Sequence, residues 1–433
     1  MYSTTKSHFT NRTPFVKLSG ILLAFIVFYG CTPKKYVDKS HDQEYKKDNK
    51  ALEVDYLIYH YDDLQSRIYY VIDNKNVIYK KTDSSQAFTA SLKLRYKIIP
   101  DPDSRIILDS GSFTITDKQV LLKQGSIGGY VSFNCKAGLA AYIELQLKDE
   151  NRKTENLVQL PIDKQNTFST QNFLLLQADS AVAVNSHFRS GTNLIVQHNR
   201  RAGQKIIVEW YRYNLKLPPP PFSELSYSAP EYRPDSIFEV YPVKNGYPVS
   251  LKQTGVYTFK AEPSSAAGCT VFVSDNDFPK VVTHEQMIAC TRYILNKEEY
   301  KKLMEAADKQ KAIEQYWLET GGNSDRAREL IRKYYGRVED ANTLFSTAEE
   351  GWKTDRGMIY IVFGSPKKVY KTTASETWIY GNEGTPNSVL FKFDKVSNKF
   401  TDNDFFLNRS LQYKDPWYMA VGAWREGNIL SDN

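Results

Sequence analysis

The sequence is poor in the residues and motifs that most enzymes use for catalysis. It has six histidines and four cysteines in 433 residues, and no histidine follows His284. No Cys-x-x-Cys pair, P-loop, Gly-x-Ser-x-Gly turn or His-Glu-x-x-His motif occurs. The C-terminal part of the chain therefore lacks the side chain that most often serves as a base near neutral pH. We expect no catalytic residue, no metal site and no cofactor.

Two acidic pairs are the candidates for an exception. Glu349 and Glu350 are adjacent, and Asp402 and Asp404 are separated by one residue. Paired carboxylates can carry acid–base chemistry or bind Ca²⁺. The second pair lacks the later ligands of an EF-hand loop, so the pattern does not favour calcium. His60 has no serine or cysteine partner that the sequence makes visible.

The sequence also lacks a strong excess of charge of one sign. Its formal net charge is +7, but residues 1–30 contain three basic residues and no acidic residue. The rest of the chain has 54 basic and 50 acidic residues, a net charge of +4. This excess is small and evenly spread, which argues against a nucleic-acid partner.

No apolar run approaches the roughly twenty residues that a membrane-spanning helix requires. The run at 18–29 is shorter and follows a basic segment without acids, which is typical of a secretory signal. It ends at Gly30 and Cys31 and resembles the lipobox of bacterial lipoproteins, with Phe28 and Tyr29 replacing the usual leucine and small residue. We predict a lipoprotein signal peptide at 1–30 and lipid on Cys31. The alternative is a signal anchor in which Cys31 has no role.

The residues after Cys31 predict a tether and a location. The segment 31–50 is polar and charged, as a flexible tether should be. A diacylglyceryl group, which the lipobox resemblance implies, would hold the chain stably on a membrane. Lys34 and Lys35 follow the cysteine without an adjacent acidic pair, so we expect the periplasmic face of the outer membrane rather than the cell surface.

Three cysteines remain if Cys31 carries lipid, and three cannot all form disulfides. Cys269 and Cys290 are close in sequence, and a disulfide between them is one interpretation in an oxidising compartment. The other interpretation, which we favour, is that Cys135, Cys269 and Cys290 are small buried apolar residues.

Two segments, 51–165 and 166–278, are each predicted to form an immunoglobulin-like β-sandwich. The clearest signal lies at 88–98, where apolar and basic residues alternate with a period of two. Further strands are predicted at 66–72, 77–80, 104–108, 129–133, 141–147, 173–176, 193–197, 205–213, 255–260 and 270–273. Four consecutive prolines lie in 217–222, which we interpret as a stiff crossover within the second module, with a peptide-ligand role as the alternative.

Helical periodicity replaces alternation in the segment 283–346. Thr283 and Gln286 fit a capping box at the start of the first helix. A second helix is predicted at 298–319, ended by the pair Gly321 and Gly322, and a third at 325–335.

The remaining segment, 347–433, carries a recognisable motif. Gly351-Trp352-Lys353-Thr354-Asp355 is followed by Arg356 and Gly357, by an apolar run at 358–363 that we expect to be a strand, and by Gly364-Ser365-Pro366. Aromatic segments at 376–380, 390–393 and 417–425 follow, and we expect these to be strands too. In this order the segments resemble the GWxTD domain, a family of bacterial proteins common in Bacteroidota. The resemblance covers about 285–425 and implies an α+β domain behind β modules, but no activity.

The motif supplies the candidate site residues, which are Gly351, Trp352, Thr354, Asp355, Arg356 and Gly357. We interpret them as a folding element. Glycine gives backbone freedom, tryptophan buries apolar area, and threonine and aspartate suit a turn. Arg356 is expected to pair with Asp355, Glu349 or Glu350. The alternative is that Trp352, Asp355 and Arg356 line a recognition or catalytic pocket.

Two functions remain open at this point. The first is a membrane-anchored, non-catalytic subunit that binds envelope proteins in a secretion, motility or outer-membrane assembly. The second is an envelope glycan-binding protein or hydrolase, in which Trp352, Trp378 and Trp417 would stack on sugars. These tryptophans lie in strand-like or core-like contexts, so burial is the simpler expectation.

Overall fold

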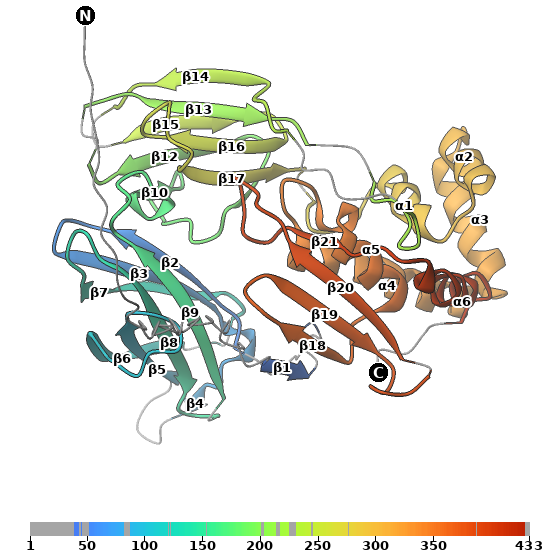
Figure 1. The fold of residues 1–433 in the computed structure, drawn as a ribbon, viewed down its shortest axis with the longest axis horizontal. Coiled ribbons are helices and arrows are strands. Elements are labelled where there is room, and N and C mark those ends of the chain that lie inside the picture. Colours follow the sequence, from blue (N-terminus) through green and yellow to red (C-terminus); the bar gives the residue numbers. More distant parts are fainter. Residues whose placement is uncertain are drawn as a thin grey trace, which may run out of the picture. The chain divides into compact units, whose positions relative to one another are not determined.

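A computed structural model describes residues 39–42, 45, 52–81, 87–119, 121, 123–152, 154–200, 203–213, 217–224, 231–243, 246–275, 277–386 and 388–428. The predicted signal peptide, Cys31 and the first part of the predicted tether lie outside these residues. Within them, no helix combines the length and the apolar composition that crossing a membrane requires. Figure 1 shows strands in the blue to yellow-green part of the chain and helices with a further sheet in the orange to red part.

The first β-sandwich consists of two sheets with a shared core. Its strands are β2 (Val54–His60), β3 (Gln65–Asp73), β4 (Lys80–Lys81), β5 (Phe88–Ile99), β6 (Asp109–Gln119), β7 (Ser126–Asn134), β8 (Ala140–Asp149) and β9 (Glu155–Asp163). One sheet has the order β2-β3-β7; the other has the order β4-β5-β8-β9, with β6 also paired to β5. Leu92, Leu94, Tyr96 and Ile98 point into the core from β5, which confirms the period-two alternation.

Two strand predictions in this module are wrong. Residues 77–79 form no strand, and only Lys80 of the strand predicted at 77–80 belongs to β4. Residues 104–107 form no strand, and Ile106 is 65% exposed. Pairing with β5 begins at Asp109, which lies opposite Ile98. The apolar residues before it lie in the connection, whereas the strand itself is mostly polar and faces solvent along much of its length.

The second β-sandwich also encloses its core between two sheets. Its strands are β10 (Phe173–Leu176), β11 (His187–Arg189), β12 (Thr192–His198), β13 (Ile206–Tyr211), β14 (Ser236–Val240), β15 (Tyr247–Leu251), β16 (Gly255–Lys260) and β17 (Cys269–Ser274). The sheet orders are β10-β12-β15 and β11-β17-β16-β13-β14. Cys135 in the first sandwich, Cys269 here and Cys290 beyond are all free and buried, so the disulfide interpretation is wrong and the burial interpretation is confirmed.

The polyproline segment also makes contacts outside the second sandwich. The carbonyl oxygen of Pro219 accepts a hydrogen bond from Arg409 at 3.2 Å, and that of Pro221 accepts one from the Ser410 backbone at 3.1 Å. Prolines keep their carbonyl acceptors although they cannot donate. The segment lies in the connection between β13 and β14, two paired strands of the second sandwich, as predicted, and it also packs against the C-terminal part of the chain.

The C-terminal domain, residues 284–428, contains six α-helices among the described residues. They are α1 (His284–Cys290), α2 (Lys297–Glu305), α3 (Lys309–Gly321), α4 (Ser324–Phe345), α5 (Asp355–Phe363) and α6 (Lys414–Arg425). The capping box at Thr283 is confirmed. The single helix predicted at 298–319 is wrong, because Asp308 caps a new helix after a break. Gly322 ends α3 in the left-handed conformation with φ 71°, as expected for its position.

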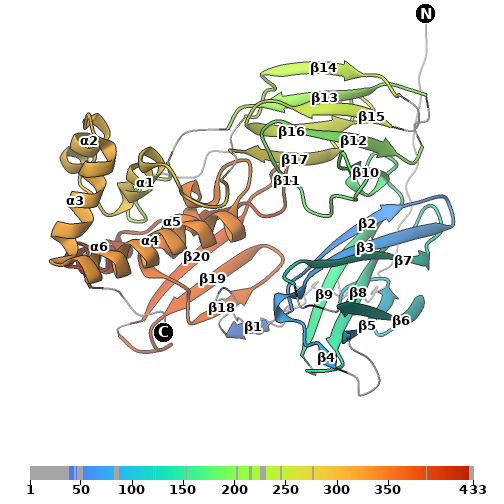
Figure 2. The same ribbon diagram turned by 180° about the vertical axis from the view of Figure 1, so that it is seen from behind.

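A five-stranded sheet completes the C-terminal domain. Its order is β1-β18-β19-β20-β21, with β1 (Lys39–Asp42), β18 (Lys368–Lys371), β19 (Ser375–Tyr380), β20 (Val389–Lys395) and β21 (Phe405–Leu407). Figure 2 shows α4 and α5 covering one face of this sheet, and helices and sheet share one hydrophobic core. Part of the predicted tether, residues 39–42, is thus a strand of the C-terminal domain.

Two elements differ from the predicted strands. Residues 358–363 belong to helix α5, all nine residues of which are buried. Residues 417–425 belong to helix α6, with Trp417, Ala420 and Trp424 on its buried side. We predicted strands in both segments because they are rich in apolar and aromatic residues. In the structure these residues belong to helices that pack into the core of the domain.

Candidate functional site

The two signature glycines lie where backbone segments touch. The signature begins with a short 3₁₀ helix, Gly351–Lys353, and continues into α5. A Cβ atom on Gly351 would overlap the carbonyl oxygen of Ala341 in α4. A Cβ atom on Gly357 would in turn overlap the carbonyl oxygen of Gly351. The two glycines therefore allow α4, the 3₁₀ helix and α5 to stack backbone against backbone.

Trp352 is held in the core by hydrogen bonds of its indole and of its backbone. Its side chain is buried, and its indole Nε1 donates to Glu350 at 2.8 Å. Its backbone N–H donates to the side chain of Asn342 at 3.1 Å, and its carbonyl accepts from Tyr293 at 2.7 Å. Glu350 also forms an ion pair with Lys353 at 2.7 Å.

Thr354 and Asp355 start a helix rather than a simple turn. Thr354 is the N-cap of α5, and its hydroxyl accepts a hydrogen bond from the Gly357 N–H at 3.0 Å. Asp355 is buried and forms an ion pair with Arg409, which is also buried. Asp355 also accepts from the Leu407 backbone N–H at 2.8 Å, which joins α5 to β21. Burial raises the pKa of Asp355, against the opposing effect of Arg409.

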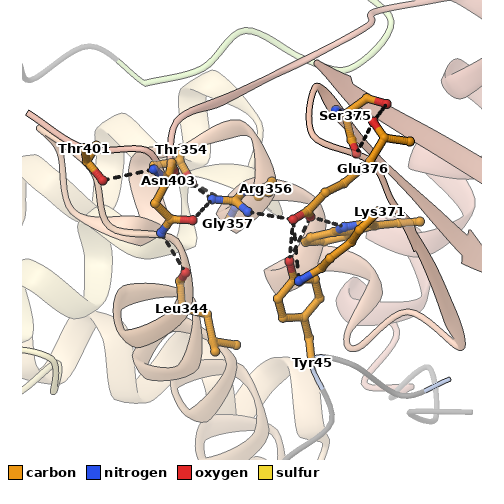
Figure 3. A network of polar contacts seen from close by, with 12 residues as sticks. Tyr45, Leu344, Thr354, Arg356, Gly357, Lys371, Ser375, Glu376, Thr401 and Asn403 are labelled. Carbon is orange, nitrogen blue, oxygen red and sulfur yellow. Dashed lines mark hydrogen bonds and ion pairs between the residues drawn. The ribbon is translucent and has the colours of Figure 1, made fainter. Parts of the chain in front are cut away.

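Arg356 is the centre of a second buried network, shown in Figure 3. Its guanidinium lies 3.4 Å from Glu376 on β19 and donates to the Asn403 carbonyl at 2.8 Å. The Asn403 amide donates onward to the Leu344 carbonyl at 3.0 Å, at the end of α4. The expected pairing of Arg356 with Asp355, Glu349 or Glu350 is therefore wrong. Adjacent helical residues do not face each other, so Asp355 and Arg356 reach different partners.

Glu376 receives hydrogen bonds from two further side chains. Trp378 donates its indole N–H at 2.9 Å, and Tyr45 donates its hydroxyl at 2.9 and 2.8 Å to the two carboxylate oxygens. Lys371 lies 3.8 Å away. The carboxylate is 6% exposed and thus lies inside the domain, where its charge is balanced by Arg356.

The acidic candidates do not converge on a reactive site. Asp402 is 98% exposed and pairs only loosely with Lys395 at 3.4 Å. Asp404 accepts from Asn398 at 2.8 Å, and burial raises its pKa. Among the described residues, no group of three or more histidine, cysteine or acidic side chains could hold a metal ion.

His60 has partners that the sequence did not reveal. Its Nδ1 lies 2.9 Å from the Ser66 hydroxyl, and its Nε2 lies 3.1 Å from the Asp163 carbonyl. Lys164 also donates to the Ser66 hydroxyl at 3.3 Å. All of these side chains except Asp163 are buried, and burial lowers the pKa of His60 to about 4. The cluster resembles a serine–histidine pair in composition, but it is closed off inside the first sandwich.

The sequence indicated the signature but not its partners. Glu376, Asn403 and Arg409 carry the contacts of Arg356 and Asp355, and each lies on a segment distant in sequence. Arg409 is a single basic residue in a mostly apolar and polar stretch, which is a weak signal for a buried ion pair. Nothing near Glu376 marks it as a partner.

One comparison with known proteins covers the signature together with Glu376, Asn403 and Arg409. A family model described as the GWxTD domain matches residues 255–426, from β16 in the second sandwich to the end of α6. No curated protein sequence matches the chain significantly. A solved structure described as "Biofilm associated protein - BSP domain" is 12% identical, with a TM-score of 0.18. The match covers 53% of this chain and 53% of that chain, so this chain spans about half the length of that structure.

Proposed function

We propose that this chain, which is a GWxTD domain-containing protein, is an envelope lipoprotein anchored by lipid on Cys31, on the periplasmic face of the outer membrane. In this proposal it is a non-catalytic interaction or accessory subunit of a secretion, motility or outer-membrane assembly. The observation that carries the proposal is the burial of the signature. Trp352, Asp355 and Arg356 are each at most 7% exposed and bind other residues of the domain. They hold α4, α5 and the sheet together and leave no free reactive group.

Glycan binding or hydrolysis is the competing function. It would use the faces of exposed aromatic rings, since sugars stack on such faces. Trp352 and Trp417 are each 7% exposed and Trp378 is fully buried, so none of the three offers a ring face to a sugar. This burial favours the interaction role.

Exposed apolar side chains offer surfaces for protein contacts. Leu411, Tyr418 and Met419 lie at and before α6, with Met419 76% exposed. A second group lies on or after β14 and includes Ile237, which is 60% exposed. A third group lies just before β6 and includes Ile107, which is 52% exposed. Protein interfaces concentrate their binding energy in a few such side chains.

The test is affinity purification of the full-length lipoprotein from crosslinked cells, with mass spectrometry of the retained proteins. Three variants, Met419→Glu, Ile237→Glu and Ile107→Glu, each place a charge in one apolar group, and each serves as a control for the others. We expect one envelope protein to be retained in stoichiometric amount by wild type and lost from one variant only. Retention of no specific envelope protein by wild type would contradict the proposal and direct attention to binding of peptidoglycan and envelope polysaccharides. Equal retention of one envelope protein by all four chains would instead exclude these three apolar groups as the contact surface.

Trp352→Ala is unsuitable for this purpose. Because the Trp352 side chain is buried and its indole N–H donates to Glu350, its removal would cost about 3 to 5 kcal/mol of folding free energy. Loss of a partner in that variant would report unfolding rather than a lost contact.

A further inference from the structure

The segment 39–42 occupies the edge of the C-terminal sheet. β1 pairs antiparallel with β18, with Lys39 opposite Lys371 and Asp42 opposite Lys368. β18 pairs with β19 on its other side. Without β1, β18 would be the edge strand of this sheet, with unpaired backbone groups.

Three residues after β1, Tyr45 enters the core of the same domain. Its ring lies 5.1 Å from the ring of Phe345 and 5.1 Å from that of Trp378. Its hydroxyl donates to the Glu376 carboxylate, and its backbone carbonyl accepts from the Tyr360 hydroxyl at 3.2 Å. Figure 3 shows the Tyr45 side chain pointing at Glu376, beside Arg356 and Lys371.

These contacts have the chemistry of strand recognition. A pairing edge supplies backbone hydrogen bonds, which bind many extended sequences, and a side-chain pocket then selects among them. Here the pocket combines aromatic walls with a buried carboxylate, and a phenol fits both because it is flat, apolar and a donor at its tip. The carboxylate is the one that Arg356 of the signature holds in place.

We propose that the β18 edge and the Phe345–Trp378–Glu376 pocket form a recognition site for an extended segment carrying a tyrosine, and that β1 and Tyr45 are its resident ligand. Because this ligand is part of the same chain, its effective concentration at the site is high, and it outcompetes segments of other molecules that could bind there. The site couples the signature network to the chain that follows Cys31. The coupling of this site to a membrane rests on the proposed lipid anchor at Cys31, whereas the docking of β1 and Tyr45 does not.

Hydrogen exchange of the full-length protein tests the docking. In wild type we expect slow exchange for the β18 amides that donate to β1. In Tyr45→Ala these amides should exchange at least about tenfold faster, while those between β19 and β20 keep their wild-type rates. Tyr241→Ala is the matched control, because Tyr241 also donates to a glutamate, Glu239, but is exposed in the second sandwich. Equal β18 exchange in wild type and Tyr45→Ala would overturn the proposal.

Binding in trans tests the recognition. The probe is a fluorescent peptide of residues 37–47, added to wild type and to the full-length double variant Ser40→Pro/Tyr45→Ala, in which proline disrupts the β1 ladder. We expect the peptide to bind the double variant and not wild type. A peptide with Tyr45→Phe should bind about tenfold more weakly or worse, since it loses the hydrogen bond to a charged acceptor. Equal binding to both proteins, binding to neither, or equal binding of the two peptides would overturn the proposal, whatever the purification from cells finds.

Discussion

Gly351 and Gly357 lie where α4, the 3₁₀ helix and α5 leave no room for a side chain. Gly357→Ala would force a methyl group against the Gly351 carbonyl, and backbone cannot move aside as a side chain can. We expect it to lower the free energy of unfolding by about 2 to 3 kcal/mol. Urea unfolding followed by tryptophan fluorescence measures this.

Gly336 supplies the control for that substitution. It lies within α4, and a Cβ atom there would meet no atom within 4 Å. Gly336→Ala should leave stability unchanged or raise it by up to about 1 kcal/mol, since alanine favours a helix more than glycine does. If both substitutions had the same effect, the steric account of the signature glycines would be wrong.

Cys31 decides between the two interpretations of the N-terminal segment. Lipidation requires its thiol, so Cys31→Ser should move the protein from the membrane fraction to the soluble fraction of the envelope. Cys135→Ala, which alters a buried free cysteine, should remain with the membrane. Fractionation with immunoblotting, and the mass of the N-terminal peptide, measure the outcome. A Cys31→Ser protein that stayed in the membrane would favour an uncleaved signal anchor.

At the scale of elements, His60 makes the first sandwich sensitive to acid. It bridges β2 to Ser66 on β3 and to Asp163 at the end of β9. Its pKa is about 4 in the folded state, below its usual value of 6.5, so the unfolded chain binds the proton more readily. The neutral histidine's contribution is therefore complete above pH 6.5 and is lost as the pH falls toward 4. Between pH 7 and pH 5 this loss amounts to about 2 kcal/mol.

Urea unfolding at several pH values checks this linkage. Glutamine does not titrate in this range. The stability of His60→Gln should therefore fall less steeply between pH 7 and pH 5 than the stability of wild type. The comparison uses the slope, which does not depend on how much the substitution destabilises the protein at pH 7. Equal slopes would mean that His60 is not the group responsible.

How far the sequence predicted each element depended on whether the element has a polar face. Strand β5 was predicted correctly because Arg95 and Lys97 face solvent between buried neighbours. Helix α5 was not, because all nine of its residues are buried and its apolar run shows no helical period. Its start signals were present, with Thr354 as N-cap and Asp355 in the first turn, but the apolar run outweighed them.

The candidate site was predictable only in part. The spacing within the signature predicted that its glycines and its tryptophan would be packed closely. It does not predict which distant residues form ion pairs and hydrogen bonds with Asp355 and Arg356. Arg356 meets Glu376 and Asn403 because β19 and the loop before β21 lie over the N-terminus of α5. That juxtaposition depends on the order of the strands, which no local pattern contains.

At the scale of the whole molecule, the hairpin tip between β20 and β21 joins the C-terminal domain to the second sandwich. Phe400 lies between Tyr211 and Tyr232, with ring centroids 4.8 Å from each. Lys399 donates to the Tyr211 hydroxyl and to the Tyr232 carbonyl, both at 3.0 Å. The family match begins at residue 255, in the sandwich strand β16, and so includes part of this junction.

This junction predicts that the two parts unfold together. Val256 of β16 and Phe272 of β17 form one buried cluster with Phe400 and Ala348 of the C-terminal domain, so separating the two parts would expose apolar surface on both. Phe400→Ala should therefore split the calorimetric transition shared by these parts into two, the lower of them several degrees below that of wild type. Leu390→Ala, at a half-exposed position on β20 of the same hairpin, should keep one transition. If Phe400→Ala lowered the melting temperature without splitting the transition, the coupling would have to come from elsewhere, with the polyproline segment bound to Arg409 as the next contact to remove.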